Sequence, residues 1–188
     1  VRGIFDDAAE KEYLKNLLQA PEKMQEVLDQ KYDIHKIARE MLDAKDAFMI
    51  GRGLDYSILL EGALKLKEVS YIHTEAYASG ELKHGTIALI TENTPVVAVV
   101  TQTKLKDKEL SNIREVQSRG ASVVLLVKDG FDLADAEYAD VFTLPAMADE
   151  FMVFPASAAL QLLAYYVSMD KGLDVDKPRN LAKVVTVE

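Results

Sequence analysis

Apolar runs separated by helix-like stretches constrain the fold of this chain more than any other feature. "AFMIG" (47–51), "TPVVAVVT" (94–101) and "ASVVLLV" (121–127) are apolar at almost every position. A strand that is apolar on both faces is buried on both sides, which is typical of parallel sheets. Alternation of such strands with helices predicts an α/β domain, a three-layer sandwich in which helices flank a parallel sheet, with right-handed crossovers.

Apolar residues three and four positions apart predict the helices. Three are expected ahead of the first strand, with Pro21 opening the second: 7–19, 21–30 and 33–44. Three more are expected among the strands, the middle one capped by Gly120: 55–72, 106–120 and 149–172. A fourth strand is expected over 140–145, and "IALI" (87–90) is either a short strand or part of a loop. We therefore divide the chain into a helical lead-in, an α/β domain and an extended tail, at 1–45, 46–172 and 173–188.

Composition narrows the classes of function. The net charge of −9 argues against nucleic acid or an anionic membrane as the main partner. The absence of cysteine excludes disulfides and thiolate chemistry and suits a reducing, cytoplasmic compartment, and the three histidines lack a metal-ligand spacing. The apolar run 151–167 is interrupted by polar residues and shorter than the ~20 residues of a membrane-spanning helix, so a buried helix is expected. No signal peptide is recognisable, and the first residue is Val rather than Met, so we expect a fragment of a longer polypeptide.

In sheets of this kind, ligands bind beyond the carboxyl ends of the strands. The loops expected there are 51–57, 101–106, 128–132 and 145–150. The first of them, "GRGLDYS", leads from a strand into a helix, so its backbone N–H groups could hold a phosphate. A plain glycine turn explains the same residues, and the sequence leaves both interpretations open.

Three other places offer reactive side chains. Glu61, Lys65 and Glu68 share one helix face, as a surface charge cluster or as part of a site. His84, in "GELKHG", is either an exposed loop residue or an acid–base group. Lys183 lies between apolar residues near the end of the chain, either with its stem over an apolar surface or as an amine of lowered pKa that could form a Schiff base.

Two motifs together carry a family resemblance. "GRG…YSILLEGALKLKEVSYIHTEAYASGELKHG" and "DVDKPRNLAKVVTVE" resemble the C-terminal part of the isomerising glutamine–fructose-6-phosphate aminotransferases, also called glucosamine-6-phosphate synthases. The similarity covers nearly the whole chain and is weakest over the first forty residues. It implies a sugar isomerase (SIS) domain of flavodoxin-like type, the second of the two in such an enzyme.

The resemblance also implies roles for particular residues. Lys183 falls on the family's Schiff-base lysine, Glu68 on the carboxylate that moves a proton between C1 and C2, and Lys65 on the lysine that stabilises the developing negative charge. His84 falls on the histidine that assists ring opening, which a neighbouring subunit of a homodimer donates, and the backbone of Ala182 would contact the sugar. The implied reaction converts fructose 6-phosphate and glutamine-derived ammonia to glucosamine 6-phosphate, without a metal or organic cofactor.

One part of the family's pattern is missing. The sugar phosphate is held there mainly by a Ser/Thr-rich loop of the first SIS domain, and no such loop is found in this sequence; the glutaminase domain is missing as well. We therefore expect the 188 residues to fold but to show little or no turnover alone. Three alternatives stay open: a non-catalytic phosphosugar-sensing module, a related deglycase or phosphosugar isomerase, and a dimerisation element built on the apolar helix.

Overall fold

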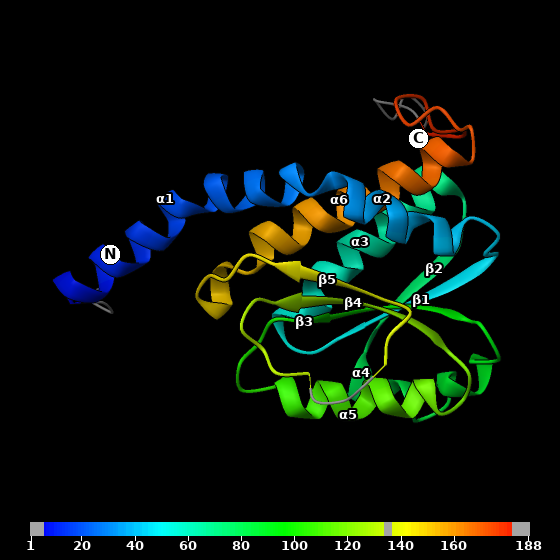
Figure 1. Cartoon of the computed structure of the whole chain (residues 1–188), viewed down its shortest axis with the longest axis horizontal. Helices are drawn as coiled ribbons and strands as arrows, with labels where there is room; N and C mark the ends of the chain where they lie inside the picture. The colour runs from blue at the N-terminus through cyan, green and yellow to red at the C-terminus, as the bar shows by residue number, and fades with distance from the viewer. Residues whose placement is uncertain (1–5, 134–136, 182–188) are drawn as a thin grey trace, which may run out of the picture.

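A five-stranded sheet forms the centre of the molecule (Figure 1). The computed structural model describes residues 6–133 and 137–181. All neighbouring strands are parallel, in the order β2-β1-β3-β4-β5. The strands are β1 (Asp46–Gly51), β2 (His73–Ala78), β3 (Pro95–Val100), β4 (Ser122–Lys128) and β5 (Asp140–Leu144). The predicted α/β class and the parallel sheet are confirmed, and the strand order is that of flavodoxin-like folds.

Helices cover both faces of the sheet. The α-helices are α1 (Asp7–Asp29), α2 (Lys31–Ala38), α3 (Leu54–Ser70), α4 (Ser79–Leu82), α5 (Lys106–Gln117) and α6 (Val153–Asp170). Short 3₁₀ turns are η1 (Arg39–Met41), η2 (Thr86–Leu89) and η3 (Asp149–Phe151). Figure 1 shows α1, α2, α3 and α6 on one face and α4 and α5 on the other. Each face has its own apolar core, one centred on Leu163 and Leu66 and the other on Leu125 and Ile113.

The apolar helix α6 belongs to the core. It packs against α1, α2 and α3, and most of its residues are buried. By length and composition the stretch 149–170 would also be able to cross a membrane, but burial of this kind is what a core helix of a globular domain shows. The structure therefore favours a core role over a role as an exposed dimerisation surface.

Three local predictions were wrong. The pattern predicts no strand at "HTEAYA", because the edge strand β2 begins with three polar residues and has no apolar run like those of β1, β3 and β4. Pro21 lies inside α1 rather than at a helix start, since Ala20 and Val27, on either side of it, are buried and keep one continuous helix on the core. Helix α5 ends at Gln117 with Ser118 as its cap, ahead of Gly120. For "IALI" the loop alternative holds, since the segment is mostly a 3₁₀ turn.

Candidate functional site

Helix α3 brings the predicted acid–amine pair together. Lys65 Nζ lies 2.6 Å from Glu68 Oε2 and 3.6 Å from Glu61 Oε1, as the helical spacing of three and four residues predicts. The side chains of Lys65 and Glu68 are 33% and 27% exposed, so both are partly covered yet open to a ligand. The hydrogen bond from Lys65 to Glu68 raises the pKa of the ammonium group, which therefore stays charged at neutral pH. Lys65 is thus suited to stabilise negative charge rather than to act as a base.

A small cavity of about 180 Å³ adjoins this pair. Its lining is apolar apart from Lys65 and Gln161, and comes from α3, α6 and the segment after α6: Lys65, Val69, Gln161, Ala164, Tyr165 and Val175. Because α3 runs from the carboxyl edge of the sheet back to the amino edge, Lys65 and Glu68 lie far from the loops at the strand ends. We expected a ligand to bind beyond the carboxyl ends of the strands, but this pair lies elsewhere.

The segment after α6 is attached to the end of α3. Tyr71 caps α3 with a left-handed backbone (φ 62°), and its hydroxyl accepts a hydrogen bond from the Arg179 backbone N–H at 2.8 Å. The Arg179 guanidinium lies 4.0 Å from the centre of the Tyr71 ring, a cation–π contact. Ala182 and Lys183 lie outside the described residues. Arg179 is within the "KPRNLAK" motif, but no sequence pattern predicts its contact with Tyr71.

His84 lies on the other side of the sheet. It follows β2 and α4, its side chain is exposed, and its backbone N–H donates to the Glu81 carbonyl at 3.0 Å. Leu82, two residues earlier, is buried in the core under α5, whereas Leu66, two residues before Glu68, is buried in the core under α6. The sheet therefore separates His84 from the Lys65–Glu68 pair within one chain.

The "GRGLDYS" loop contains a buried carboxylate. Gly53 begins α3 with a left-handed backbone (φ 59°) and no side-chain cap. Asp55, in the first turn, accepts hydrogen bonds from the backbone N–H and the hydroxyl of Thr101 across the sheet edge. Burial raises the pKa of Asp55 to about 6, so the group carries negative charge at neutral pH. Its charge at the helix start opposes binding of an anion, and the structure favours the glycine-turn interpretation of this loop.

The other loops at the carboxyl edge are tied to one another. Asp149 accepts hydrogen bonds from the Thr103 backbone N–H at 2.7 Å and from Lys128 Nζ at 2.8 Å. Burial opposes ionisation of Asp149, but the bonds from Lys128 and Thr103 prevail and hold its pKa below the usual range. Charged and polar groups of these loops thus bind other loops of the same chain.

A second buried carboxylate was not predicted. Glu109, on α5, is 1% exposed, and its Oε2 accepts a hydrogen bond from the Ser79 hydroxyl at 2.5 Å. Arg52 Nε lies 3.8 Å from the same oxygen. Burial raises the pKa of Glu109 to about 7. No sequence pattern predicts this burial, because Glu109 is one of many charged residues on a predominantly polar helix.

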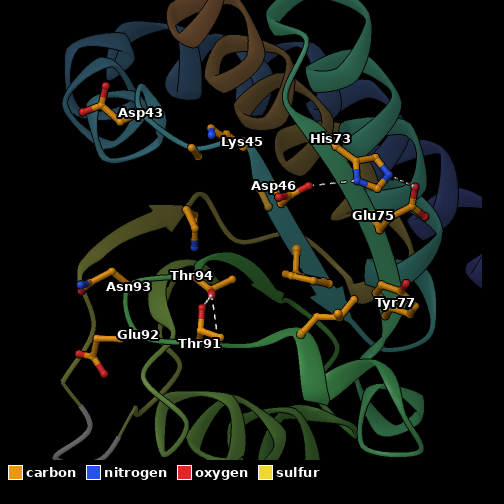
Figure 2. Close-up of a pocket in the computed structure, with 15 residues that line it drawn as sticks. Asp43, Lys45, Asp46, His73, Glu75, Tyr77, Thr91, Glu92, Asn93 and Thr94 are labelled. Atoms are coloured by element: carbon orange, nitrogen blue, oxygen red, sulfur yellow. Dashed lines mark hydrogen bonds and ion pairs between the residues drawn. The ribbon is translucent and has the colours of Figure 1, made fainter.

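A larger cavity, of about 550 Å³, opens at the amino edge of β1, β2 and β3 (Figure 2). Its rim carries four carboxylates: Asp43, Asp46, Glu75 and Glu92. His73 lies between two of them, with Nδ1 3.2 Å from Asp46 and Nε2 3.5 Å from Glu75. Lys45 is the one ammonium group among the lining residues, so a phosphorylated ligand would meet mostly negative charge there. This cavity holds none of the predicted site residues. Among residues 6–133 and 137–181, no cluster of three or more potential metal ligands is found.

Fold and site together define a class of protein: a doubly wound α/β domain with a carboxylate–ammonium pair on its third helix. The chain belongs to the SIS domain family, whose model matches residues 40–169. The chain is 49% identical, over 187 residues, to the isomerising glutamine–fructose-6-phosphate aminotransferase of Caldanaerobacter subterraneus subsp. tengcongensis. The aligned region is 100% of this chain but 31% of that protein. The chain is homologous to the C-terminal part of such proteins.

Solved structures agree with this assignment. The C-terminal domain of glucosamine-fructose-6-phosphate aminotransferase from Francisella tularensis superposes with a TM-score of 0.86 at 40% identity, over 92% of this chain and 49% of that one. Glucosamine-6-phosphate deaminase from Thermotoga maritima gives a TM-score of 0.66 at 25% identity, over 91% of this chain and 48% of that one. The chain thus spans about a third of its curated relative and about half of each of these solved chains.

Proposed function

We propose that these residues form part of the isomerase half of a glutamine–fructose-6-phosphate aminotransferase, which converts fructose 6-phosphate and glutamine-derived ammonia to glucosamine 6-phosphate in the cytoplasm. The division into a lead-in (1–45), a SIS domain (46–172) and a tail (173–188) is part of this proposal. The observation that carries it is the Lys65–Glu68 pair, which lies in the last turns of α3, next to the place where Tyr71 holds Arg179.

The position of Arg179 supports a role for Lys183. The two are four positions apart in the sequence, and an extended chain of that length spans at most about 14 Å. Arg179 is held at Tyr71, three residues beyond Glu68. Covalent geometry alone therefore keeps Lys183 within reach of the surface that carries the carboxylate.

The chemistry divides among these groups in a defined order. The Lys183 amine condenses with the C2 carbonyl of the open-chain ketose and releases water, and ammonia then displaces the lysine to leave an imine at C2. The imine acidifies the hydrogen on C1, which Glu68 removes and returns to C2. The C1 hydroxyl gives up its proton and the imine nitrogen gains one, so that an aldehyde at C1 and an amino group at C2 result. The charged Lys65 stabilises the electron-rich intermediate between the two proton transfers.

Ring opening is assigned to His84 of a neighbouring subunit. An acid–base group must act at the anomeric oxygen before C2 becomes a carbonyl, and a histidine titrates near neutral pH. The separation of His84 and Glu68 by the sheet supports donation across a homodimer, because one chain does not bring both to the same surface. We further propose that a first SIS domain supplies the phosphate-binding loop and a glutaminase domain supplies the ammonia, in keeping with the internally paired loops of this domain.

Trapping of the imine tests the proposal. A polypeptide of the relatives' length that carries these 188 residues is mixed with fructose 6-phosphate, reduced with borohydride, and digested for mass spectrometry. We expect the reduced sugar adduct on Lys183 and its loss in Lys183→Ala. Lys177→Ala, six residues earlier in the same segment, is the matched control and should retain the adduct.

The same experiment separates the enzyme from a phosphosugar sensor. A sensor binds the sugar without covalent capture, so binding without an adduct on any lysine would favour a non-catalytic SIS module. An adduct on another lysine would refute the assignment of Lys183.

A further inference from the structure

His84 lies in a short segment whose own residues do little to fix the position of the histidine. Helix α4 spans four residues, Ser79–Leu82, and His84 comes after its C-cap, Lys83. A single helical turn is not stable by itself in water. Contacts with other elements must therefore determine where His84 lies.

Those contacts come from three residues that the proposed chemistry does not use. Glu109 Oε2, on α5, accepts the hydrogen bond from the Ser79 hydroxyl at 2.5 Å, and Asn112 Nδ2 donates to the same hydroxyl at 2.9 Å. The Arg52 guanidinium lies directly against Gly80, so closely that a Cβ at position 80 would collide with it. The start of α4 is thus held from α5 on one side and from the loop after β1 on the other.

This cluster is buried and charged. Glu109 is 1% exposed, and Arg52 Nε is buried at 3.8 Å from its carboxylate. Asp55 is the other charged group that acts on Glu109. Buried polar groups of this kind specify one arrangement, because any shift of α4 would leave the carboxylate without its hydroxyl donor.

We propose that Glu109 and Arg52 are positioning residues, which fix Ser79 and Gly80 and thereby hold His84 in the place from which it assists ring opening. The inference rests on the proposed role of His84. It predicts that loss of Glu109 harms the reaction only when a ring has to be opened.

An open-chain substrate provides the test. 5-Deoxyfructose 6-phosphate lacks the C5 hydroxyl that closes the furanose ring, so it needs no ring opening. In a polypeptide of the relatives' length, we expect Glu109→Leu to lower kcat/KM for fructose 6-phosphate by roughly 10- to 100-fold. For the 5-deoxy analogue the change should stay within about threefold, since only the ring-opening step is misplaced. Glu109→Gln keeps an oxygen that accepts from Ser79 and should restore most of the activity, and Glu115→Leu, at a more exposed position of α5, should change neither substrate.

The 188-residue chain gives an independent readout. Hydrogen exchange of the backbone amides in residues 79–86 should accelerate in Glu109→Leu but not in Glu109→Gln or Glu115→Leu. Equal losses on both substrates, or no loss on either, would overturn the positioning role of Glu109. If His84→Gln itself impairs both substrates equally, the ring-opening assignment is wrong, which is a separate failure.

Discussion

At the scale of single residues, the site combines charged groups with different environments. The hydrogen bond to Glu68 raises the pKa of the charged Lys65, while Glu109 and Asp55 are carboxylates whose pKa values burial raises to about 7 and about 6. Lys65 lines a cavity, whereas Glu109 and Asp55 are enclosed by protein. Exposure to a ligand therefore separates the residues proposed for chemistry from those that hold the structure.

The two carboxylates near Lys65 allow a matched comparison. Glu68 is 27% exposed and lies 2.6 Å from Lys65 Nζ, while Glu61 is 47% exposed at 3.6 Å. Glu68→Gln should lower kcat for glucosamine 6-phosphate formation by about 10²-fold or more, because a general base is lost. Glu61→Gln should change kcat by less than about threefold, since an exposed ion pair contributes little. Equal effects of the two substitutions would remove the reason for assigning proton transfer to Glu68.

Burial of Glu109 should make stability depend on pH. The folded chain holds the proton up to about pH 7, whereas the group in the unfolded chain ionises near its ordinary value of 4.5. Between these values the folded state binds more protons, so this contribution to stability is present below pH 4.5 and is lost as pH rises through 7. Glu109→Gln removes this pH dependence. The free energy of unfolding of Glu109→Gln should therefore rise by about 1–3 kcal/mol, relative to that of the unsubstituted chain, from pH 5 to pH 8.

Urea unfolding at a series of pH values measures this difference. The free energy of unfolding of both chains is compared at each pH, so that other titrating groups cancel. A difference that stays constant from pH 5 to pH 8 would show that Glu109 titrates as an ordinary carboxyl.

At the scale of elements, α3 connects the core to the site. One of its faces packs on α6 and the other carries the Lys65–Glu68 pair. The approach to α6 is close at Gly62, where a Cβ would lie 2.9 Å from Leu160 Cδ1. The position of the Lys65–Glu68 pair thus depends on how closely two core helices pack.

A larger side chain at Gly62 should disturb both stability and site. Gly62→Val overpacks the contact with Leu160 and should lower the free energy of unfolding by about 1–3 kcal/mol. Leu60→Val, at a half-exposed position of the same helix, controls for the β-branched residue and should change it by less than about 1 kcal/mol. Thermal unfolding by circular dichroism distinguishes the two, and equal losses would indicate that helix propensity rather than packing determines the effect.

The elements that the sequence predicted are those whose signal is local. Apolar runs identified β1, β3 and β4, and helical periodicity identified α3 and α6. Strand β2 escaped prediction because it has one neighbour in the sheet and keeps polar residues on its exposed side. Pro21 misled because a proline in a helix is tolerated when tertiary packing compensates for the lost hydrogen bond.

In the candidate site, too, contacts between residues close in sequence were predictable and contacts between distant residues were not. The spacing of Lys65 and Glu68 placed them on one face of a helix, and the structure confirms that contact. The Tyr71–Arg179 and Ser79–Glu109 contacts join residues 108 and 30 positions apart, so no local pattern announces them. The resemblance identified candidate residues but gave no account of what holds them in place.

At the scale of the whole molecule, the described residues form a folded unit, and the proposed function requires other domains to complete the site. Two apolar cores enclose the sheet on both faces, so we expect the 188 residues to fold cooperatively. The polar groups at its carboxyl edge bind one another, which leaves no phosphate clamp among the described residues. Without remote binding of the phosphate, the reacting carbons are not held in place.

The chain alone should therefore melt in one transition yet lack turnover. Scanning calorimetry tests the first part, and an assay of glucosamine 6-phosphate formation from fructose 6-phosphate and ammonia tests the second. Turnover at a rate close to that of a polypeptide of the relatives' length would show that the phosphate is held by this domain, contrary to the proposal.

Subunit complementation tests the arrangement across the proposed dimer. Glu68 and His84 of one chain lie on opposite sides of its sheet, so each complete site should take one residue from each subunit. In polypeptides of the relatives' length, Glu68→Gln and His84→Gln dimers should each be nearly inactive. After equimolar mixing and exchange of subunits, half of the dimers are hybrids with one intact site, so about a quarter of the full activity should return.

The pattern of recovery identifies which subunit supplies His84. If His84 served the Glu68 of its own chain, every hybrid site would still lack one of the two groups and mixing would restore nothing. A double variant, with Glu68→Gln and His84→Gln in one chain, gives the opposite result when mixed with unsubstituted chains. Its hybrids should be inactive under donation between subunits and half-active under donation within one chain, because the unsubstituted chain then keeps both groups in its own site.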